Sequence, residues 1–206
     1  MTPMPIIHTL SLGDYQTNCY IVHAKDAASC AIIDPGYEPE RVLAFVAEQG
    51  LRVDAVLLTH GHFDHVGAVE TIVTKTNCAL WMSQSDWTQF PSPIIAHYFP
   101  LANCDFTDVQ FCEDGQEICA GGLTFTALST PGHTAGSMCF VCEDALFSGD
   151  TLFSGSCGRT DLPGGNWLQM QQSLQRLSGL PGDYFVHPGH GPGTILSMER
   201  KFNPYF

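Results

Sequence analysis

The sequence places four potential metal ligands within six residues, directly after an apolar run. Residues 55–58 predict a buried strand, and it is followed by His60, His62, Asp64 and His65. A short polar loop rooted in a strand can turn all four side chains toward one point. Zinc and similar cations prefer imidazole and carboxylate ligands, and crowding such groups without a cation would cause repulsion and costly desolvation. This segment therefore predicts a metal site.

Three further candidate ligands each follow a predicted strand. His133 lies in a Thr-Pro-Gly-His segment, Asp150 in a Ser-Gly-Asp segment and His190 in a Pro-Gly-His segment. Singly, each has an ordinary explanation as a turn residue. Together with the first cluster they make five histidines and two aspartates at strand ends. That set suits two metal ions, each with three protein ligands, a shared carboxylate and an open position for water.

Apolar periodicity predicts an α/β chain with its sites at the carboxyl ends of strands. The expected strands are residues 6–12, 17–23, 31–34, 53–58, 79–82, 117–119, 123–129, 137–142, 145–148 and 184–186. The expected helices are residues 39–49, 66–76 and 167–178, with a short one within 194–206. Pro39 suits a first helical turn, and Gly50 and Asn166 suit helix caps. Residues 1–206 are expected to form a single domain.

Residues 87–100 crowd aromatic side chains together with prolines and show no clean period. One interpretation is a hydrophobic loop packed on the core. The other is a wall or lid at the mouth of a pocket, where aromatic rings contact an apolar part of a substrate.

Charge and composition exclude some partners. The net charge is −13, and eight Lys and Arg residues form no basic stripe, which argues against nucleic acid. No apolar stretch approaches the roughly 20 residues that span a bilayer, and no signal peptide is evident. Nine scattered cysteines predict reduced thiols in a cytoplasmic protein. We expect a monomer or small homo-oligomer that acts on a small molecule.

The His-x-His-x-Asp-His segment at residues 60–65, together with His133, Asp150 and His190, resembles the metallo-β-lactamase superfamily. The resemblance implies an αββα sandwich: two face-to-face mixed sheets with outer helices and metals at one edge. It also implies two divalent metal ions, with zinc expected and iron or manganese as alternatives. The implied ligands of one ion are His60, His62 and His133, those of the other are Asp64, His65 and His190, and Asp150 bridges the two.

Within the superfamily, residues 149–165 and 188–192 resemble glyoxalase II-like hydrolases. The similarity is greatest to short bacterial forms that lack the C-terminal helical domain. Glyoxalase II hydrolyses the thioester S-lactoylglutathione, and that extra domain supplies much of the glutathione contact. The resemblance implies hydroxyacylglutathione hydrolase-type chemistry. Because the chain stops at Phe206 and so lacks that contact surface, the acyl and thiol parts of the substrate are left open.

The expected reaction is attack on a thioester or ester carbonyl by a hydroxide held between two metals. Asp64 is the predicted catalytic residue, because it can orient or deprotonate the water while binding a metal. Arg159 is the predicted substrate-binding residue; it holds an anionic group, or it braces a loop by pairing with Asp161. The candidates to hydrogen-bond the ligand imidazoles are Asp34, Thr59, Thr134 and Ser137, with ordinary strand-end hydrogen bonding as the alternative.

Three other functions compete with the thioesterase interpretation. An iron-dependent persulfide dioxygenase resembles this family and shares the Gly-Arg-Thr-Asp segment at residues 158–161, but uses one iron. A lactonase or β-lactamase would use the same site on another substrate. A module that only binds metal is the third alternative, and the full ligand set argues against it.

Overall fold

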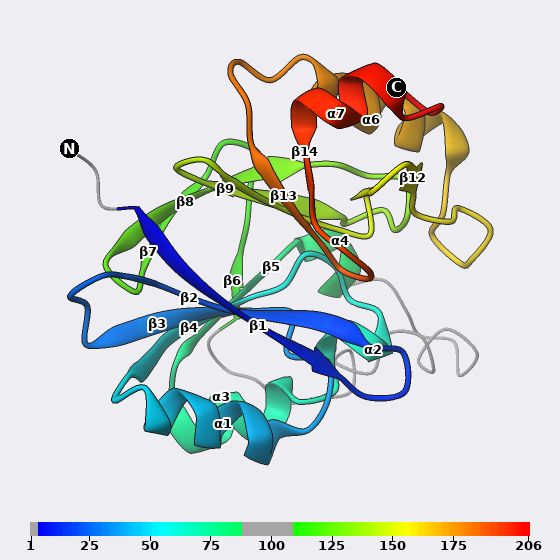
Figure 1. The fold of residues 1–206 in the computed structure, drawn as a ribbon. Coiled ribbons are helices and arrows are strands. Elements are labelled where there is room, and N and C mark those ends of the chain that lie inside the picture. The colour runs from blue at the N-terminus through cyan, green and yellow to red at the C-terminus, as the bar shows by residue number, and fades with distance from the viewer. Residues whose placement is uncertain (1–3, 88–108) are drawn as a thin grey trace.

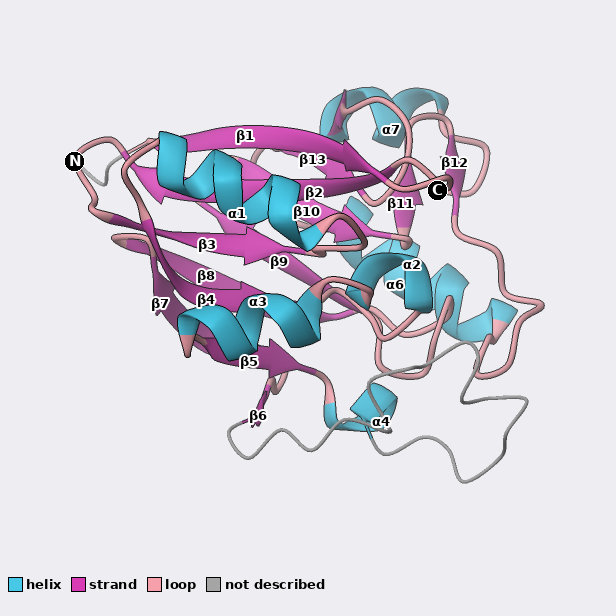
Figure 2. Cartoon of the chain, turned by 90° about the horizontal axis from the view of Figure 1, so that it is seen from below, coloured by secondary structure: helices cyan, strands magenta, loops and turns pink. Residues whose placement is uncertain are grey.

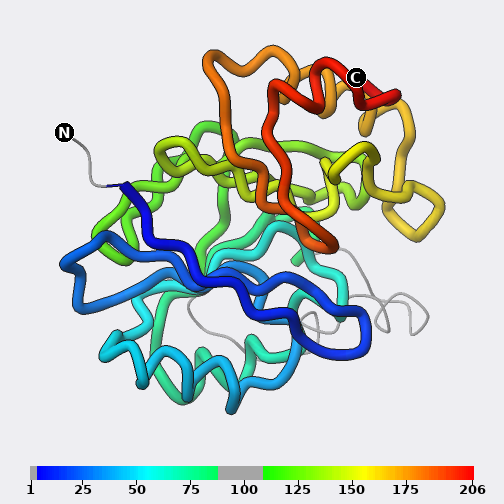
Figure 3. The backbone as a smooth tube through the Cα atoms, in the orientation of Figure 1, coloured from blue at the N-terminus to red at the C-terminus, as the bar shows by residue number. Residues whose placement is uncertain are grey.

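Two six-stranded sheets lie face to face in the computed structural model, which describes residues 4–87 and 109–206 (Figure 1). The chain builds one sheet after the other: its first half forms the lower layer in Figure 3 and its second half the upper layer. The expected αββα sandwich with mixed sheets is confirmed. Whether residues 1–206 are a single folding domain stays a prediction.

The first sheet has the strand order β1-β2-β3-β4-β5-β6. Strands β1, β2 and β3 pair antiparallel, whereas β3, β4, β5 and β6 pair parallel. Each connection between neighbouring parallel strands must therefore be a crossover. Helices supply the crossovers from β3 to β4 and from β4 to β5. The strands are β1 Pro5–Leu12, β2 Thr17–Ala24, β3 Ser29–Ile33, β4 Arg52–Leu57, β5 Ala79–Met82 and β6 Val109–Phe111.

The second sheet has the order β14-β13-β10-β9-β8-β7 and is antiparallel except between β10 and β13. A small two-stranded sheet, β11 Leu152–Phe153 and β12 Ser156–Cys157, follows β10. The strands of the second sheet are β7 Glu117–Ala120, β8 Leu123–Ser129, β9 Met138–Cys142, β10 Ala145–Gly149, β13 Phe185–Pro188 and β14 Thr194–Ile195.

Helices cover the outer face of each sheet, as Figure 2 shows for α1 and α3. Three apolar clusters fill the three gaps between layers: helices against the first sheet, sheet against sheet, and the second sheet against α6 and α7. Burying these faces is the main stabilising term of such a sandwich. The helices are α1 Pro39–Glu48, α2 Phe63–Val66, α3 Val69–Thr76, α4 Gln84–Trp87, α6 Trp167–Ser178 and α7 Leu196–Phe202.

Local signals placed most helix ends correctly. Pro39 occupies the first turn of α1, and Gly50 follows its end at a φ of 69°. Asn166 caps α6 by accepting a hydrogen bond from the Gln169 amide at 3.0 Å. Such a cap contributes about 1 kcal/mol to helix stability.

The expected single helix over residues 66–76 is wrong: α2 and α3 are separate helices, and α2 begins three residues earlier. The cause is a tertiary contact. A Cβ atom on Gly67 would overlap the carbonyl oxygen of Gly36, and the Ala68 amide donates to the Pro35 carbonyl at 3.0 Å. The chain therefore turns at Gly67. As a result Asp64 and His65 lie in a helical turn, not in an open loop.

Of the aromatic segment at residues 87–100, only Trp87 belongs to the described part of the chain, so both interpretations of that segment stay untested. Within the described residues, no helix is long and apolar enough to cross a membrane. None of the eight cysteines described there is paired in a disulfide.

Candidate metal centre

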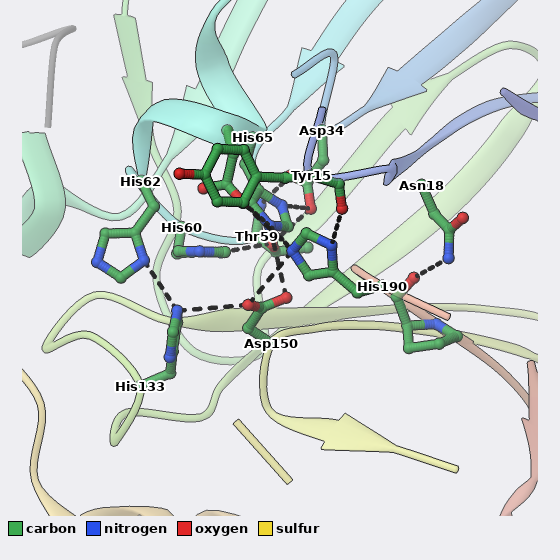
Figure 4. A network of polar contacts seen from close by, with 12 residues as sticks. Tyr15, Asn18, Asp34, Thr59, His60, His62, His65, His133, Asp150 and His190 are labelled. Carbon is green, nitrogen blue, oxygen red and sulfur yellow. Dashed lines mark hydrogen bonds and ion pairs between the residues drawn. The ribbon is translucent and has the colours of Figure 1, made fainter. Parts of the chain in front are cut away.

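Strand ends deliver the candidate ligands to one edge of the sandwich. His60 and His62 follow β4, and Asp64 and His65 sit in the short helix α2 that comes next. The other three ligands follow β8, β10 and β13 of the second sheet: His133, Asp150 and His190. All seven predicted residues therefore converge on one site built from both sheets, and Figure 4 shows six of them labelled.

The first group consists of His60, His62 and His133, whose side chains are buried and offer ligand atoms within 4.8 Å of one another. Nδ1 of His62 lies 2.8 Å from Nε2 of His133. Three imidazoles at this spacing can hold one divalent cation and leave a position open.

The second group consists of Asp64, His65 and His190, again within 4.8 Å. Nε2 of His190 lies 3.2 Å from Asp64 Oδ2 and 3.2 Å from Nε2 of His65. The side chain of His190 is 27% exposed, whereas that of His65 is fully buried, so His190 lies on the open side of this group.

The carboxylate of Asp150 lies between the two groups. Its Oδ1 is 3.4 Å from Nε2 of His65, and its Oδ2 is 3.5 Å from Nε2 of His133 and 3.7 Å from that of His190. A carboxylate placed in this way can contact two cations at once. The close packing around this carboxylate explains why residue 189 is a glycine. A Cβ atom on Gly189 would overlap Asp150 Oδ1 and would lie 2.6 Å from the His65 ring.

Hydrogen bonds fix three of the imidazoles from behind. Nδ1 of His65 donates to Asp34 Oδ2 at 2.9 Å, that of His133 to the Arg159 carbonyl at 2.8 Å, and that of His190 to the Tyr15 carbonyl at 3.1 Å. Because the three partner oxygens act as acceptors, Nδ1 carries a proton and Nε2 is the ring nitrogen directed at the site. Histidines that bind metals are held in this way.

Local electrostatics keep part of the donor set in its ligand form. Burial, followed by neighbouring histidines, holds the pKa of His60 well below its usual value and lowers that of His62 to about 3. Burial alone would raise the pKa of Asp64, but the hydrogen bond with His190 and the proximity of His65 lower it to about 2. Neutral imidazoles and an ionised carboxylate are the forms that bind metals.

The residues fit a metal centre on two further observations. His60 Nε2 and Asp150 Oδ1 are buried and find no hydrogen-bond partner in the described residues, which is costly unless a cation satisfies them. Burial would lower the pKa of His65, yet the carboxylates of Asp150 and Asp34 raise it to about 9, so this cluster attracts positive charge. The metal-binding role of the seven residues stays a prediction that this geometry supports.

Two of the four predicted supporting residues contact ligand imidazoles. Asp34 bonds to His65, and it also accepts from the Thr59 amide at 2.8 Å and the Thr59 hydroxyl at 2.6 Å. Thr59 Oγ1 in turn lies 3.0 Å from Nδ1 of His60. The other two, Thr134 and Ser137, bond to each other at 2.8 Å instead.

The sequence interpretation missed three supporting groups. Two are the Arg159 carbonyl behind His133 and the Tyr15 carbonyl behind His190, since backbone groups leave no residue-type signal. The third is Asp86 in α4, which accepts hydrogen bonds from Gly61 and Thr134. A single acidic residue in a four-residue helix has no periodicity or motif by which it could have been found.

The site opens into a cavity of about 610 Å³. Aromatic and aliphatic side chains form part of its wall, including Tyr15, Phe63, Phe153 and Leu162. Arg159 also lines it, and its guanidinium makes two 2.7 Å hydrogen bonds to the carboxylate of Asp161. The loop-bracing alternative for Arg159 is therefore present in the structure, and its substrate-binding role stays a prediction.

We expect Asp34→Asn to weaken metal binding about 10- to 100-fold, the usual effect of losing such a supporting partner. Asparagine tolerates the left-handed backbone of Asp34, whose φ is 50°. Its amide group, however, would donate toward Nδ1 of His65 and shift the ring proton to Nε2. Competition with a chromophoric chelator measures the affinity.

The control for this variant is Asp183→Asn, which alters a carboxylate that also accepts from a hydroxyl and a backbone amide, both of Ser197. Its metal affinity should equal that of the unaltered protein. Equal affinities of Asp34→Asn and Asp183→Asn would show that Asp34 does not set the tautomer of His65.

Comparison with known proteins defines the class. Residues 12–190 match the profile of the metallo-beta-lactamase superfamily, and the chain belongs to that superfamily. Its members bind metal ions and are generally hydrolases, and the His/Asp cluster described above could hold such ions. The predicted family is thereby confirmed.

Particular relatives cover nearly the whole chain. Hydroxyacylglutathione hydrolase GloC of Haemophilus influenzae is 35% identical over 206 residues, with 97% of each chain covered. The solved structure of TTHA1623 in a di-iron-bound form is 37% identical with a TM-score of 0.82, covering 97% of this chain and 100% of that chain. That of BLEG-1 B3 metallo-beta-lactamase is 32% identical with a TM-score of 0.83, covering 97% and 99%.

Proposed function

We propose that the protein is a dinuclear metal-dependent thioesterase of the hydroxyacylglutathione hydrolase type. The observation that carries the proposal is the position of Asp150, whose two carboxylate oxygens face ligands of both groups. The 35% identity to GloC supports the thioester substrate class. We expect zinc, although the di-iron form of TTHA1623 makes iron the strongest alternative.

In this proposal the described residues divide the work. His60, His62 and His133 would hold one cation, Asp64, His65 and His190 would hold the other, and Asp150 would contact both. Bound divalent cations supply Lewis acidity toward water and toward a carbonyl oxygen. Asp64 lines the cavity beside His190, where its carboxylate would orient the attacking water.

The chemistry of the leaving group favours a thioester over an amide. A thiol has a pKa near 8.5, so a thiolate leaves without a strong general acid, whereas an amide nitrogen needs protonation. The apolar wall formed by Tyr15, Phe63, Phe153 and Leu162 suits the hydrocarbon part of an acyl or thiol group.

A matched substrate pair tests the proposal. We expect hydrolysis of S-lactoylglutathione and of the neutral N-acetylcysteamine thioester of the same acid, with a high KM for the glutathione ester. The reason is that Asp161 already engages Arg159, and the protein carries a net charge of −13. Steady-state kinetics measure both KM values, and Arg159→Ala serves as a third arm: a raised KM for the glutathione ester would assign Arg159 a substrate-binding role, and an unchanged KM would leave it as a brace of its loop.

Lactones and nitrocefin complete the panel. Faster turnover of either than of both thioesters would replace the thioesterase proposal with a lactonase or β-lactamase. Tight binding of the glutathione ester that weakens with salt would show that a cationic surface receives it after all.

The second candidate is an iron-dependent persulfide dioxygenase, favoured by the Gly158-Arg159-Thr160-Asp161 segment. Such an enzyme uses a single iron, whereas this chain presents a complete second group beside the first. One iron per chain together with persulfide-dependent oxygen uptake would establish this candidate and reject the hydrolase.

A further inference from the structure

Asp86 is a buried carboxylate that is neither a candidate metal ligand nor part of the cavity wall. It projects from α4, is 2% exposed, and accepts three hydrogen bonds. Its Oδ2 accepts from the Gly61 amide at 2.9 Å and from the Thr134 hydroxyl at 2.8 Å, and its Oδ1 accepts from the Gly136 amide at 2.8 Å.

The donors come from the two loops that carry the three-histidine group. Gly61 stands between His60 and His62 in the loop after β4 of the first sheet. Thr134 directly follows His133 in the loop after β8 of the second sheet. One carboxylate oxygen therefore joins the backbone of the first loop to a side chain of the second.

The contact is close and specific. A Cβ atom on Gly136 would lie 2.5 Å from Asp86 Oδ1 and 2.7 Å from the Asp86 amide nitrogen, so this loop packs directly against the carboxylate. Burial raises the pKa of Asp86 although the hydrogen bonds act to lower it. Burying a carboxylate here costs free energy of folding, and a buried polar group of this kind is kept where its hydrogen bonds have a function.

We propose that Asp86 is a positioning residue that sets the spacing of His60 and His62 relative to His133, and so the affinity of the three-histidine metal site. This inference rests on the proposed metal centre. Asp86 does not touch the cation or the substrate; it acts through the two loops. The second group, Asp64 with His65 and His190, has its own supports in Asp34 and the Tyr15 carbonyl and should not depend on Asp86.

The test measures metal affinity in Asp86→Asn by competition with a chromophoric chelator, for zinc and for cobalt. The NH2 group of asparagine must stand either in place of Oδ2, facing the Gly61 amide and the Thr134 hydroxyl, or in place of Oδ1, facing the Gly136 amide, so at least one of the three hydrogen bonds that tie α4 to the two loops is lost. We expect one metal equivalent to bind about 10- to 100-fold more weakly and the other to bind as before. The visible spectrum of the cobalt form should change for the weakened equivalent alone.

A matched control comes from the other end of the sandwich. Asp54, near the start of β4, accepts from the Ser29 hydroxyl at 2.5 Å and from the Gly121 amide at 3.0 Å, and so also joins the two sheets. Asp54→Asn should lower thermal stability while both metal equivalents keep their affinity. If Asp54→Asn and Asp86→Asn change metal binding equally, Asp86 has only a general structural role and the proposal fails.

Thr134 supplies a milder variant in case Asp86→Asn folds poorly. Thr134→Val removes the hydroxyl bond to Asp86 at nearly constant volume, and Thr134→Ser keeps it. The valine variant should weaken the same metal equivalent and the serine variant should restore it. Equal affinities in the two would overturn the proposal.

Double variants assign the effect to one group. Asp86→Asn should weaken the metal that remains in His190→Ala and should have no further effect in His133→Ala, whose three-histidine group is already broken. The reverse pattern would refute the assignment. If the unaltered protein binds no metal at all, the proposed metal centre itself fails, and this outcome is distinct from unchanged binding in Asp86→Asn.

Discussion

Removal of divalent metal by a chelator should lower the thioester hydrolysis rate by at least about 10²- to 10³-fold, the cost of losing one preorganised oxyanion stabiliser. Without cations, the site loses the Lewis acid that would polarise the carbonyl, and the carboxylates of Asp64 and Asp150 oppose an approaching hydroxide. The measurement is the initial rate against residual metal, determined by elemental analysis on the same samples.

Restoration is the control for chelation. Adding back zinc, manganese or iron should recover activity in steps that follow occupancy, with full recovery near two equivalents per chain. Recovery complete at one equivalent would contradict the dinuclear proposal, and full activity in metal-free samples would contradict metal-dependent hydrolysis altogether.

Asp150→Ala should reduce the rate at least about a hundredfold and weaken both metal equivalents about tenfold or more. Its two carboxylate oxygens are the atoms that face both ligand groups, at 3.4 Å from His65 and 3.5 Å from His133. Without them each cation loses one ligand, and less negative charge is left to offset the repulsion among the imidazoles. Calorimetric titration of the metal-free variant with zinc measures both equivalents.

The exposed carboxylate of Asp161, at the same side of the molecule, provides the matched control. Asp161→Asn removes a negative charge near the pocket without touching a ligand, so metal affinity should stay within about twofold, in line with a surface pair. Loss of only one equivalent in Asp150→Ala would show that Asp150 binds a single cation and does not bridge.

The convergence of the seven candidate ligands was largely predictable because its signals are local. The seven residues lie in the short segments that follow β4, β8, β10 and β13, and a strand can be recognised from a few apolar neighbours. Convergence from both sheets followed from the family resemblance. The break at Gly67 was not predictable, since it depends on the carbonyl of Gly36, about thirty residues earlier in the chain.

Of the carboxylates that support the ligand-bearing loops, Asp34 was predictable from the sequence and Asp86 was not. Asp34 precedes a Pro-Gly turn at the end of β3, where a polar side chain next to the site is expected. Asp86 reaches the site from a separate helix, and its partners are two backbone amides and one hydroxyl. Only the folded arrangement reveals such a contact, because the sequence neighbours of Asp86 carry no trace of it.

The ligands come in nearly equal numbers from the two sheets, and this has a mechanical consequence for the whole molecule. Ions bound there would crosslink the first half of the chain to the second at the edge of the sandwich that carries the seven candidate ligands. The opposite rim is closed by protein groups alone, through Asp54 and Gly121. The concentration of available metal would then set the stability of the contact between the two sheets at that edge as well as the rate of the reaction.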